Sequence, residues 1–170
     1  MIRSMLIQAF IAFLAFQAIS LFQERNMVSV DENPFVNRDN QNVVNKLFVL
    51  PTTDGDEISL NVQGKKTVIY FFAPWCTICH ASISNLQSLY ESNEHIDVIA
   101  VALDYANVEE IHDFTNEHQL TFPVALGNES IKQVFSISAY PSYYVLDSNN
   151  EVIGRSMGYS TELGLFLRTL

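Results

Sequence analysis

The chain of 170 residues has little basic charge, little glycine and proline, and only two cysteines. Nine lysines and arginines stand against 19 acidic residues, a formal net charge of −10. A protein this acidic is repelled by phosphate backbones, so nucleic-acid binding ranks last among the functions considered. Six glycines and five prolines exclude a collagen-like or low-complexity chain. Two cysteines exclude a small secreted scaffold built on several disulfides.

The length and composition are typical of one globular domain preceded by an apolar segment. Hydrophobic residues make up 48% of the chain and charged residues 16%, and a single domain usually contains about 100–200 residues. We predict three regions. Residues 1–22 are a membrane anchor or signal sequence, residues 23–45 are a polar spacer, and residues 46–170 are the globular domain.

An uncharged run of eighteen residues, MLIQAFIAFLAFQAISLF, occupies positions 5–22. A helix of this length would cover about 27 Å, close to the roughly 30 Å core of a bilayer. Arg3 precedes the run, so the positive-inside rule predicts export of the rest of the chain. An uncleaved anchor is favoured because the cleavage site at residues 18–20 is poor, while a cleaved signal peptide stays open. We therefore expect the domain in the cell envelope, facing the periplasm or another extracytoplasmic space, either anchored or secreted.

Hydrophobic patterning after residue 46 predicts an α/β domain with a mixed central sheet flanked by helices. TVIYFF at residues 67–72 and IDVIAVAL at 96–103 are typical of buried central strands. Further strands are expected at 47–50 and 58–60, which form an N-terminal hairpin, and at 122–125, 142–146 and 151–156. Helices are expected from residue 76 and at 107–118, 129–135 and 161–167. Asn107 and Glu110 have the spacing of a capping box.

Cys76 and Cys79 stand where a buried strand is predicted to pass into a helix. A helix N-terminus carries partial positive charge, which favours a thiolate on Cys76. Cys79, one turn deeper, can then attack a mixed disulfide and release the reduced partner. The pair therefore predicts a reversible two-electron dithiol, with Cys76 attacking and Cys79 resolving. This chemistry needs no organic cofactor and no metal.

Three other interpretations of these residues stay open. Cys76, Cys79 and His80 match the Cys-x-x-Cys-His pattern of c-type haem attachment, which would make the chain an electron carrier. Haem attachment would usually need a small helical domain. A structural zinc would need a second ligand pair, and the other three histidines are scattered over predicted helix ends and faces. A fixed disulfide would make the chain an anchored interaction module, although a four-residue ring constrains little chain entropy.

The segment around the cysteines resembles the thioredoxin superfamily. The TVIYFF strand, the Ala-Pro-Trp lead-in at 73–75 and the cysteine pair match the active-site segment of that superfamily, and Ala-Tyr-Pro at 139–141 is a second matching motif. The resemblance implies that Pro141 is cis and lies beside the cysteines. It also implies that the backbone of Tyr140 can pair with a bound peptide strand, and that Trp75 covers the dithiol and shapes the docking surface.

More narrowly, residues 46–170 resemble the membrane-anchored TlpA/ResA-like thiol-disulfide oxidoreductases. The matching features are the anchor, the hairpin before the active-site strand and the inserted helix at 107–118. The resemblance implies a thioredoxin-like fold and a reductase of protein disulfides, recharged by a transmembrane thiol-electron carrier. A peroxiredoxin is a weaker interpretation, because Ala73 occupies the position, three residues before Cys76, where those enzymes usually have threonine.

Several positions depart from the pattern of the relatives. Many thioredoxins have a buried acid six residues before the first cysteine, where this chain has Tyr70, and cytochrome-maturation members often carry a glutamate where it has Ser82. Both differences weaken a specific role in cytochrome c maturation. Glu109 or Glu110 could supply an acid from the inserted helix, although solvated residues at a helix start are the simpler interpretation. His80 could raise the thiolate fraction of the dithiol or could be an exposed helix residue.

Overall fold

The computed structural model describes residues 48–61 and 64–170, together with residues 7, 8, 10, 11, 14, 27, 34 and 35. Most of the apolar run at 5–22 and most of segment 23–45 lie outside the described residues. The anchor and the three-part division of the chain therefore stay predictions. Within the described residues, no helix is both long and apolar enough to cross a membrane.

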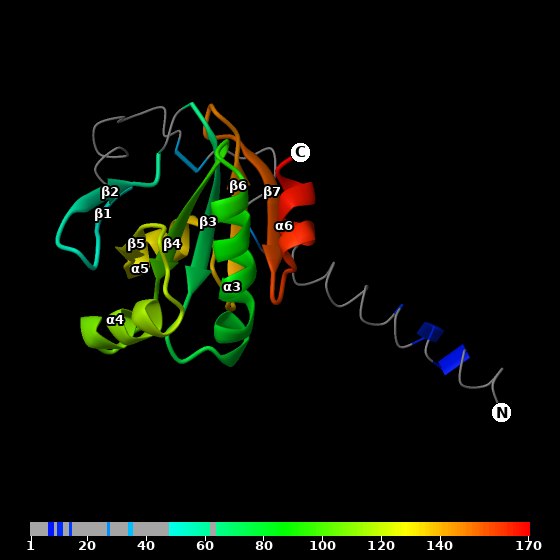
Figure 1. Cartoon of the computed structure of the whole chain (residues 1–170), viewed down its shortest axis with the longest axis horizontal. Helices are drawn as coiled ribbons and strands as arrows, with labels where there is room; N and C mark the ends of the chain where they lie inside the picture. Colours follow the sequence, from blue (N-terminus) through cyan, green and yellow to red (C-terminus); the bar gives the residue numbers. More distant parts are fainter. Residues whose placement is uncertain are drawn as a thin grey trace.

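Five strands form a mixed central sheet in the order β5-β4-β3-β6-β7 (Figure 1). The strands are β3 (Lys66–Phe72), β4 (Ile96–Ala102), β5 (Val124–Leu126), β6 (Ser142–Leu146) and β7 (Val152–Met157). β3, β4 and β5 run parallel to one another, whereas β6 is antiparallel to both β3 and β7. The carboxyl ends of β3 and β4 consequently meet at one edge of the sheet, together with the start of β6.

The predicted N-terminal hairpin is a separate two-stranded sheet beside β5. It consists of β1 (Val49–Pro51) and β2 (Glu57–Ser59), which pair antiparallel. An isolated bridge between Thr52 and Ala125 connects the hairpin to β5. The hairpin therefore lies along the edge strand β5, whose outer edge would otherwise be exposed.

Helices cover both faces of the sheet (Figure 1). They are α3 (Thr77–Ser92), α4 (Val108–Glu117), α5 (Glu129–Val134) and α6 (Glu162–Arg168). The buried side chains of α3, α4 and α6 belong to one hydrophobic cluster, and those of α5 belong to the other. The domain is thus a sheet between two helical layers, as the alternation of strands and helices predicted.

The central strand β3 contributes to both hydrophobic clusters because alternate side chains of a strand point to opposite faces. Val68, Tyr70 and Phe72 lie on the face of α3, whereas Ile69 and Phe71 lie on the face of α5. All five side chains are fully buried. This confirms the prediction of a strand buried on both faces.

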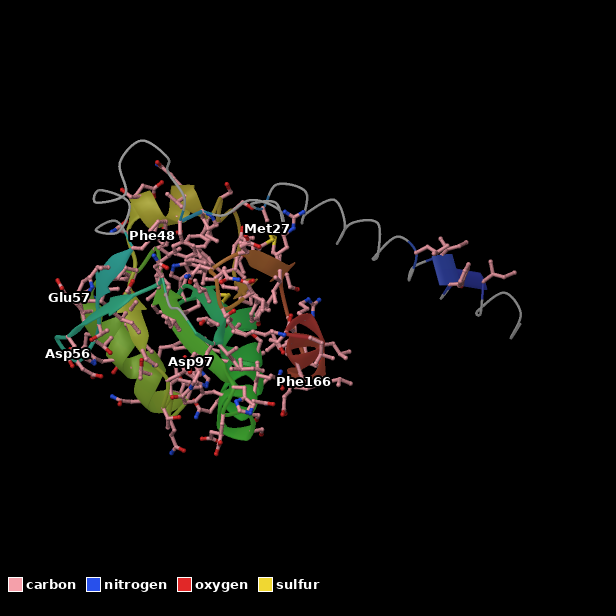
Figure 2. The ribbon with its side chains drawn as sticks, turned by 90° about the horizontal axis from the view of Figure 1, so that it is seen from above. Met27, Phe48, Asp56, Glu57, Asp97 and Phe166 are labelled. Carbon is pink, nitrogen blue, oxygen red and sulfur yellow. A yellow bond between two sulfur atoms is a disulfide. The ribbon has the colours of Figure 1, made fainter. Side chains whose placement is uncertain are left out.

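Two residues from the N-terminal segment belong to the core on the α5 face. Met27 and Phe35 are 4% and 6% exposed, and the ring of Phe35 lies 4.4 Å from that of Phe48, centroid to centroid. Arg155 donates a hydrogen bond from Nη1 to the carbonyl oxygen of Met27 at 2.8 Å. Figure 2 shows Met27 and Phe48 on the same side of the sheet as α5. The core therefore includes side chains from the segment that was interpreted as a spacer.

The observed elements follow the predicted order, and their bounds differ by one or two residues. The strand expected at 122–125 is found at Val124–Leu126, because Pro123 has no N–H to donate to a strand ladder. Cys76 is the N-cap of α3 rather than its first residue. Asn107 caps α4 and Thr161 caps α6, as their side chains suggested.

Candidate active site

The cysteine pair lies where β3 passes into α3. The amide of Cys76 donates to the carbonyl of Ala73 at 3.0 Å, which turns the chain after the strand. Cys76 is extended, with φ −82° and ψ 105°, and its Sγ accepts a hydrogen bond from the amide of Cys79 at 3.1 Å. This sulfur therefore takes the N-cap position usually held by a serine or aspartate oxygen. A negative charge on Cys76 would be stabilised there by the helix dipole.

Cys76 and Cys79 form a disulfide, with their Cα atoms 5.2 Å apart. The two residues differ in their access to solvent, since Cys76 is 7% exposed and Cys79 is fully buried. Both Thr77 and Ile78 between them are exposed. Of the two sulfur-bearing residues, only Cys76 therefore reaches the surface of the domain.

The loop that precedes β6 lies beside the end of β3. In the antiparallel register Phe71 is opposite Ser142, so residues 139–141 stand next to the segment that leads to Cys76. The peptide bond between Tyr140 and Pro141 is cis, as the resemblance implied. The ring of Tyr140 meets that of Trp75 edge to face, with centroids 5.9 Å apart. The structure thus brings Trp75, Tyr140 and Pro141 to the same edge of the sheet as the cysteines.

Asp104, which is not among the site residues predicted from the sequence, connects these residues. Its carbonyl oxygen accepts a hydrogen bond from Nε1 of Trp75 at 2.9 Å. Its Oδ2 accepts one from the hydroxyl of Tyr140 at 2.9 Å and one from Nζ of Lys132 at 2.6 Å. The hydrogen bond from Lys132 lowers the pKa of the Asp104 carboxyl, and the bond from Tyr140 acts in the same direction. Burial and then the nearby Asp104 raise the pKa of Tyr140.

The signal that could have identified Asp104 is its place directly after a parallel strand. Side chains at the carboxyl ends of adjacent parallel strands meet at one edge of the sheet, and ligands of α/β proteins commonly bind there. Asp104 follows β4 by two residues, and β4 lies next to β3, which leads to the cysteines. Its backbone has φ +50°, a left-handed conformation that aspartate tolerates better than most residues.

Beneath the disulfide lies a buried pair of hydroxyl groups, Tyr70 and Ser82. These are the two positions at which relatives often have carboxylates. The hydroxyl of Tyr70 donates to the carbonyl of Cys79 at 3.3 Å and lies 3.4 Å from Oγ of Ser82. Ser82 also donates to the carbonyl of Ile78 at 2.9 Å. Burial strongly raises the pKa of the Tyr70 phenol, so this phenol stays protonated and cannot accept a proton from Cys79 as a carboxylate could.

His80 is held in place rather than free on the helix surface. Its Nε2 lies 2.8 Å from the carbonyl oxygen of Pro74, and its Nδ1 lies 2.8 Å from Nε2 of His118. The ring also packs against Phe114, with centroids 4.6 Å apart. The sequence pattern scatters His95, His112 and His118 over predicted helix ends and faces, but the end of α4 places His118 against the first turn of α3.

Glu109 and Glu110 lie in the first turn of α4. Glu110 Oε2 accepts a hydrogen bond from the amide of Ala106 at 3.1 Å, and the amide of Glu110 donates to Oδ1 of Asn107 at 3.1 Å. Asn107 is therefore the N-cap that the sequence predicted, whereas Glu110 accepts from the residue before the N-cap and not from the amide of Asn107, so the second bond of the capping box is shifted by one residue. Glu109 is exposed. Both glutamates therefore have a structural explanation at the start of the helix.

The surroundings of Cys76, Cys79 and His80 do not favour haem attachment. The motif lies at a strand–helix junction of a mixed sheet rather than in a small helical domain. His80, the third residue of that motif, donates from Nε2 to the carbonyl oxygen of Pro74, and its ring packs against Phe114. The geometry instead combines an N-cap sulfur, a second sulfur behind it and a surface of aromatic rings beside both.

Comparison with known proteins agrees with this geometry. The family model described as AhpC/TSA matches residues 43–155. The sporulation thiol-disulfide oxidoreductase A of Bacillus subtilis is 27% identical over 126 residues, which cover 71% of this chain and 76% of that protein. The thiol-disulfide oxidoreductase ResA of Oceanobacillus iheyensis is 30% identical over 95 residues, which cover 54% of this chain and 49% of that protein.

Solved structures show the same fold. The crystal structure of StoA from Bacillus subtilis superposes with a TM-score of 0.65 at 26% identity and covers 72% of this chain and 96% of that one. A secreted disulfide oxidoreductase of Mycobacterium tuberculosis superposes with a TM-score of 0.64 at 20% identity, covering 72% of this chain and 94% of that one, and supports the fold alone. With its Cys76–Cys79 disulfide at the start of α3, the chain belongs to the AhpC/TSA family and is a thiol-disulfide oxidoreductase with a thioredoxin-like fold.

Proposed function

We propose that the chain reduces disulfides of other proteins in an extracytoplasmic space. The observation that carries this proposal is the asymmetry of the cysteine pair. Cys76 reaches the surface at the N-cap of α3, and Cys79 is fully buried behind it. A helix N-terminus stabilises the thiolate form of the outer cysteine. Cys76 is therefore assigned as the attacking thiolate and Cys79 as the resolving thiol.

The cycle begins from the reduced dithiol. The Cys76 thiolate attacks one sulfur of a substrate disulfide, which forms a mixed disulfide and releases the first substrate sulfur as a thiolate that takes up a proton. Cys79 then loses its proton and attacks Sγ of Cys76. This step restores the Cys76–Cys79 disulfide and releases the second substrate thiol. Two electrons have passed to the substrate, and an external dithiol must return two electrons to the protein.

The aromatic surface beside Cys76 is the proposed docking site for the substrate chain. Trp75 is 64% exposed and stands edge to face with Tyr140, so both can bury apolar substrate side chains. The backbone at Tyr140 and Pro141 lies beside the end of β3, where an extended peptide could add main-chain hydrogen bonds. Specificity then depends on this surface rather than on a deep pocket.

The apolar run at residues 5–22 supports attachment of the domain to a membrane or secretion across it. In that setting a transmembrane thiol-electron carrier is the proposed reductant, because soluble cytosolic reductants do not reach an extracytoplasmic domain. The redox-active disulfide is the only cofactor that this chemistry needs. The Tyr70–Ser82 pair offers no carboxylate at the positions typical of cytochrome-maturation members, so that narrower role is not proposed.

Trapping the mixed disulfide in the bacterial envelope tests the proposed roles of the two cysteines. The full chain is expressed as wild type, Cys79→Ser and Cys76→Ser, and thiols are quenched with acid before non-reducing electrophoresis. We expect Cys79→Ser to give adducts that dithiothreitol removes, and Cys76→Ser to give none. An active wild type whose Cys79→Ser variant captures nothing would contradict the two-cysteine mechanism.

The direction of electron flow is tested by the midpoint potential. Trp75 is the only tryptophan, so its fluorescence reports the state of the adjacent disulfide during equilibration with dithiothreitol or glutathione buffers. A midpoint near or below about −250 mV would agree with a reductase, since thioredoxin lies at about −270 mV. A midpoint near about −120 mV would identify an oxidant that introduces disulfides.

A further inference from the structure

Three side chains with metal-binding atoms meet beside the dithiol, and the redox cycle uses none of them as a ligand. They are His80 in the first turn of α3, Glu117 at the last residue of α4 and His118 at its C-cap. Nδ1 of His80 lies 2.8 Å from Nε2 of His118 and 3.6 Å from Oε2 of Glu117. All three ligand atoms lie within 4.8 Å of one another.

The orientation of His80 is that of a metal-binding histidine. Its Nε2 lies 2.8 Å from the carbonyl oxygen of Pro74, and a carbonyl oxygen can only accept a hydrogen bond. Nε2 therefore carries the proton, and Nδ1 presents a lone pair toward His118 and Glu117. Histidine ligands of metals almost always donate their other ring N–H in this way, which fixes the ring and its tautomer.

The second histidine faces Nδ1 of His80. The ring of His118 packs against Phe114, with centroids 4.7 Å apart, and its Nε2 lies 2.8 Å from Nδ1 of His80, to which it donates a hydrogen bond when no metal is bound. A metal ion would take the place of the proton between these two nitrogens, so binding releases that proton.

The electrostatic surroundings favour a cation. The small pocket against His80 is lined by Pro74, Trp75 and Phe114 and by three acidic residues, Glu110, Asp113 and Glu117, with no lysine or arginine in its lining. The C-terminal end of α4, which carries partial negative charge, supplies Glu117 and His118. The dipole at the start of α3 opposes a cation.

We propose that Nδ1 of His80, Nε2 of His118 and Oε2 of Glu117 bind one divalent transition metal ion of the zinc type, with one position left open to water. Two nitrogens and one carboxylate oxygen are a ligand set that Zn²⁺ accepts, and in a tetrahedral zinc site neighbouring ligand atoms stand about 3.3 Å apart. The pair of histidine nitrogens, 2.8 Å apart, would have to separate by about 0.5 Å. Oε2 of Glu117, 3.6 Å from Nδ1 of His80, would have to move toward both nitrogens. The site lies outside the thiol chemistry and is independent of the direction of electron flow.

Zinc titration of the full chain in its disulfide form tests the site. The disulfide form is essential because free thiolates of Cys76 and Cys79 would bind zinc themselves. The chain is kept in mild detergent on account of its apolar residues 5–22, and zinc chloride is added in a calorimeter. We expect one Zn²⁺ per chain, and a loss of affinity of about tenfold or more in His80→Ala and in His118→Ala.

His95→Ala is the matched control, because His95 is an exposed histidine at the opposite end of the sheet, in the turn before β4. This variant should bind zinc as the wild type does, and Glu117→Gln should bind it more weakly. Circular dichroism and the additional variant His118→Gln separate loss of a ligand from loss of the fold. Imidazole ¹⁵N signals give a direct readout, since zinc should shift Nδ1 of His80 and Nε2 of His118 but neither nitrogen of His95.

Two results would overturn the proposal. One is the absence of zinc binding by the oxidised wild type. Zinc binding that appears only after reduction counts as the same result, because the cysteines would then be the ligands. The other is binding by His118→Ala with wild-type affinity and stoichiometry. Neither result would affect the trapping experiment with Cys79→Ser, so the metal site and the redox function are tested separately.

Discussion

The two sides of the Cys76–Cys79 disulfide differ in almost every physical respect. On the outer side, Trp75 and Tyr140 form an aromatic surface held by hydrogen bonds to the exposed residue Asp104. On the inner side, Cys79 is fully buried, and its carbonyl accepts a hydrogen bond from the buried hydroxyl of Tyr70, which also lies beside Ser82. The outer side is accessible to solvent and to a binding partner, whereas the inner side is not.

This difference is the physical basis for the two different roles that we propose for two identical side chains. The outer sulfur accepts the amide hydrogen bond at the helix N-cap and can meet a bulky substrate. The inner sulfur can react only with the outer one, because no substrate reaches it. The inner side also has no carboxylate at the positions of Tyr70 and Ser82, so the proton that Cys79 releases must leave by another route. Residues on each side can be substituted independently, and the substitutions are expected to differ in the size of their effects.

Removal of the outer sulfur should have the largest effect. Cys76→Ser leaves no accessible nucleophile, so we expect disulfide reduction to fall by at least about 10³-fold.

In the reduced wild type, iodoacetamide should modify Cys76 long before Cys79, because Cys79 is fully buried. Mass spectrometry of tryptic peptides after timed alkylation measures both rates. Equal rates for the two cysteines would contradict the assigned roles.

The inner aromatic residue should matter far more for stability than the outer one. Tyr70 is fully buried and Trp75 is 64% exposed. Tyr70→Ala should lower the free energy of unfolding by about 3–5 kcal/mol, as expected for the loss of a large core side chain. Trp75→Ala should lower it by less than about 1 kcal/mol, the worth of one exposed hydrogen bond. Urea unfolding with a constant m value tests this, and similar losses in the two variants would contradict it.

The inner side could largely be predicted from sequence, and much of the outer side could not. The β-branched and aromatic side chains of residues 67–72 predict a strand that is buried on both faces. The position of Cys76 and Cys79 directly after this strand, where a helical pattern begins, predicts that they lie at a helix start. These are local patterns. Asp104 and His118, in contrast, join the site only because β4 lies beside β3 and α4 folds back against α3. The position of Asp104 after a predicted strand marks it as a candidate only once the order of the strands is known, and no local pattern indicates that α4 brings His118 to α3.

The segment before the domain shows the same limit. Residues 23–45 are polar as a whole, which favours a spacer, but Met27 and Phe35 are buried in the core. Each belongs to a pair of neighbouring apolar residues between polar ones. Such short pairs give no helical or strand periodicity, so only the tertiary structure reveals what they pack against.

Removal of the Tyr70 hydroxyl alone should have a small effect. Tyr70→Phe loses the hydrogen bond to the carbonyl of Cys79, and we expect a loss of about 0.5–1.5 kcal/mol in the free energy of unfolding. Because burial strongly raises the pKa of this phenol, it stays protonated at neutral pH and cannot act as a base. At each pH between 6 and 8, Cys79 should therefore resolve a preformed mixed disulfide at the same rate in Tyr70→Phe as in the wild type. Stopped-flow fluorescence can measure this rate. A marked slowing in Tyr70→Phe would show that the phenol takes part in proton transfer.

Removal of the outer carboxylate should have the smallest and the most pH-dependent effect. The pKa of Asp104 is lowered chiefly by the hydrogen bond from Lys132, so its folded pKa lies below the unfolded value of about 3.9. A carboxyl with a depressed pKa stabilises the fold above the unfolded pKa, and this stability is lost as the pH falls through the folded pKa. The side chain of Asp104 is 37% exposed, so solvent limits its contribution to about 1 kcal/mol or less. Asp104→Asn should therefore be slightly less stable than the wild type at pH 7, and the difference should shrink as the pH falls below about 4. Thermal unfolding at both pH values measures this, with Asp113→Asn as the control on an exposed aspartate of α4. A stability difference that is the same at both pH values would show that the charge of Asp104 does not stabilise the outer side of the site.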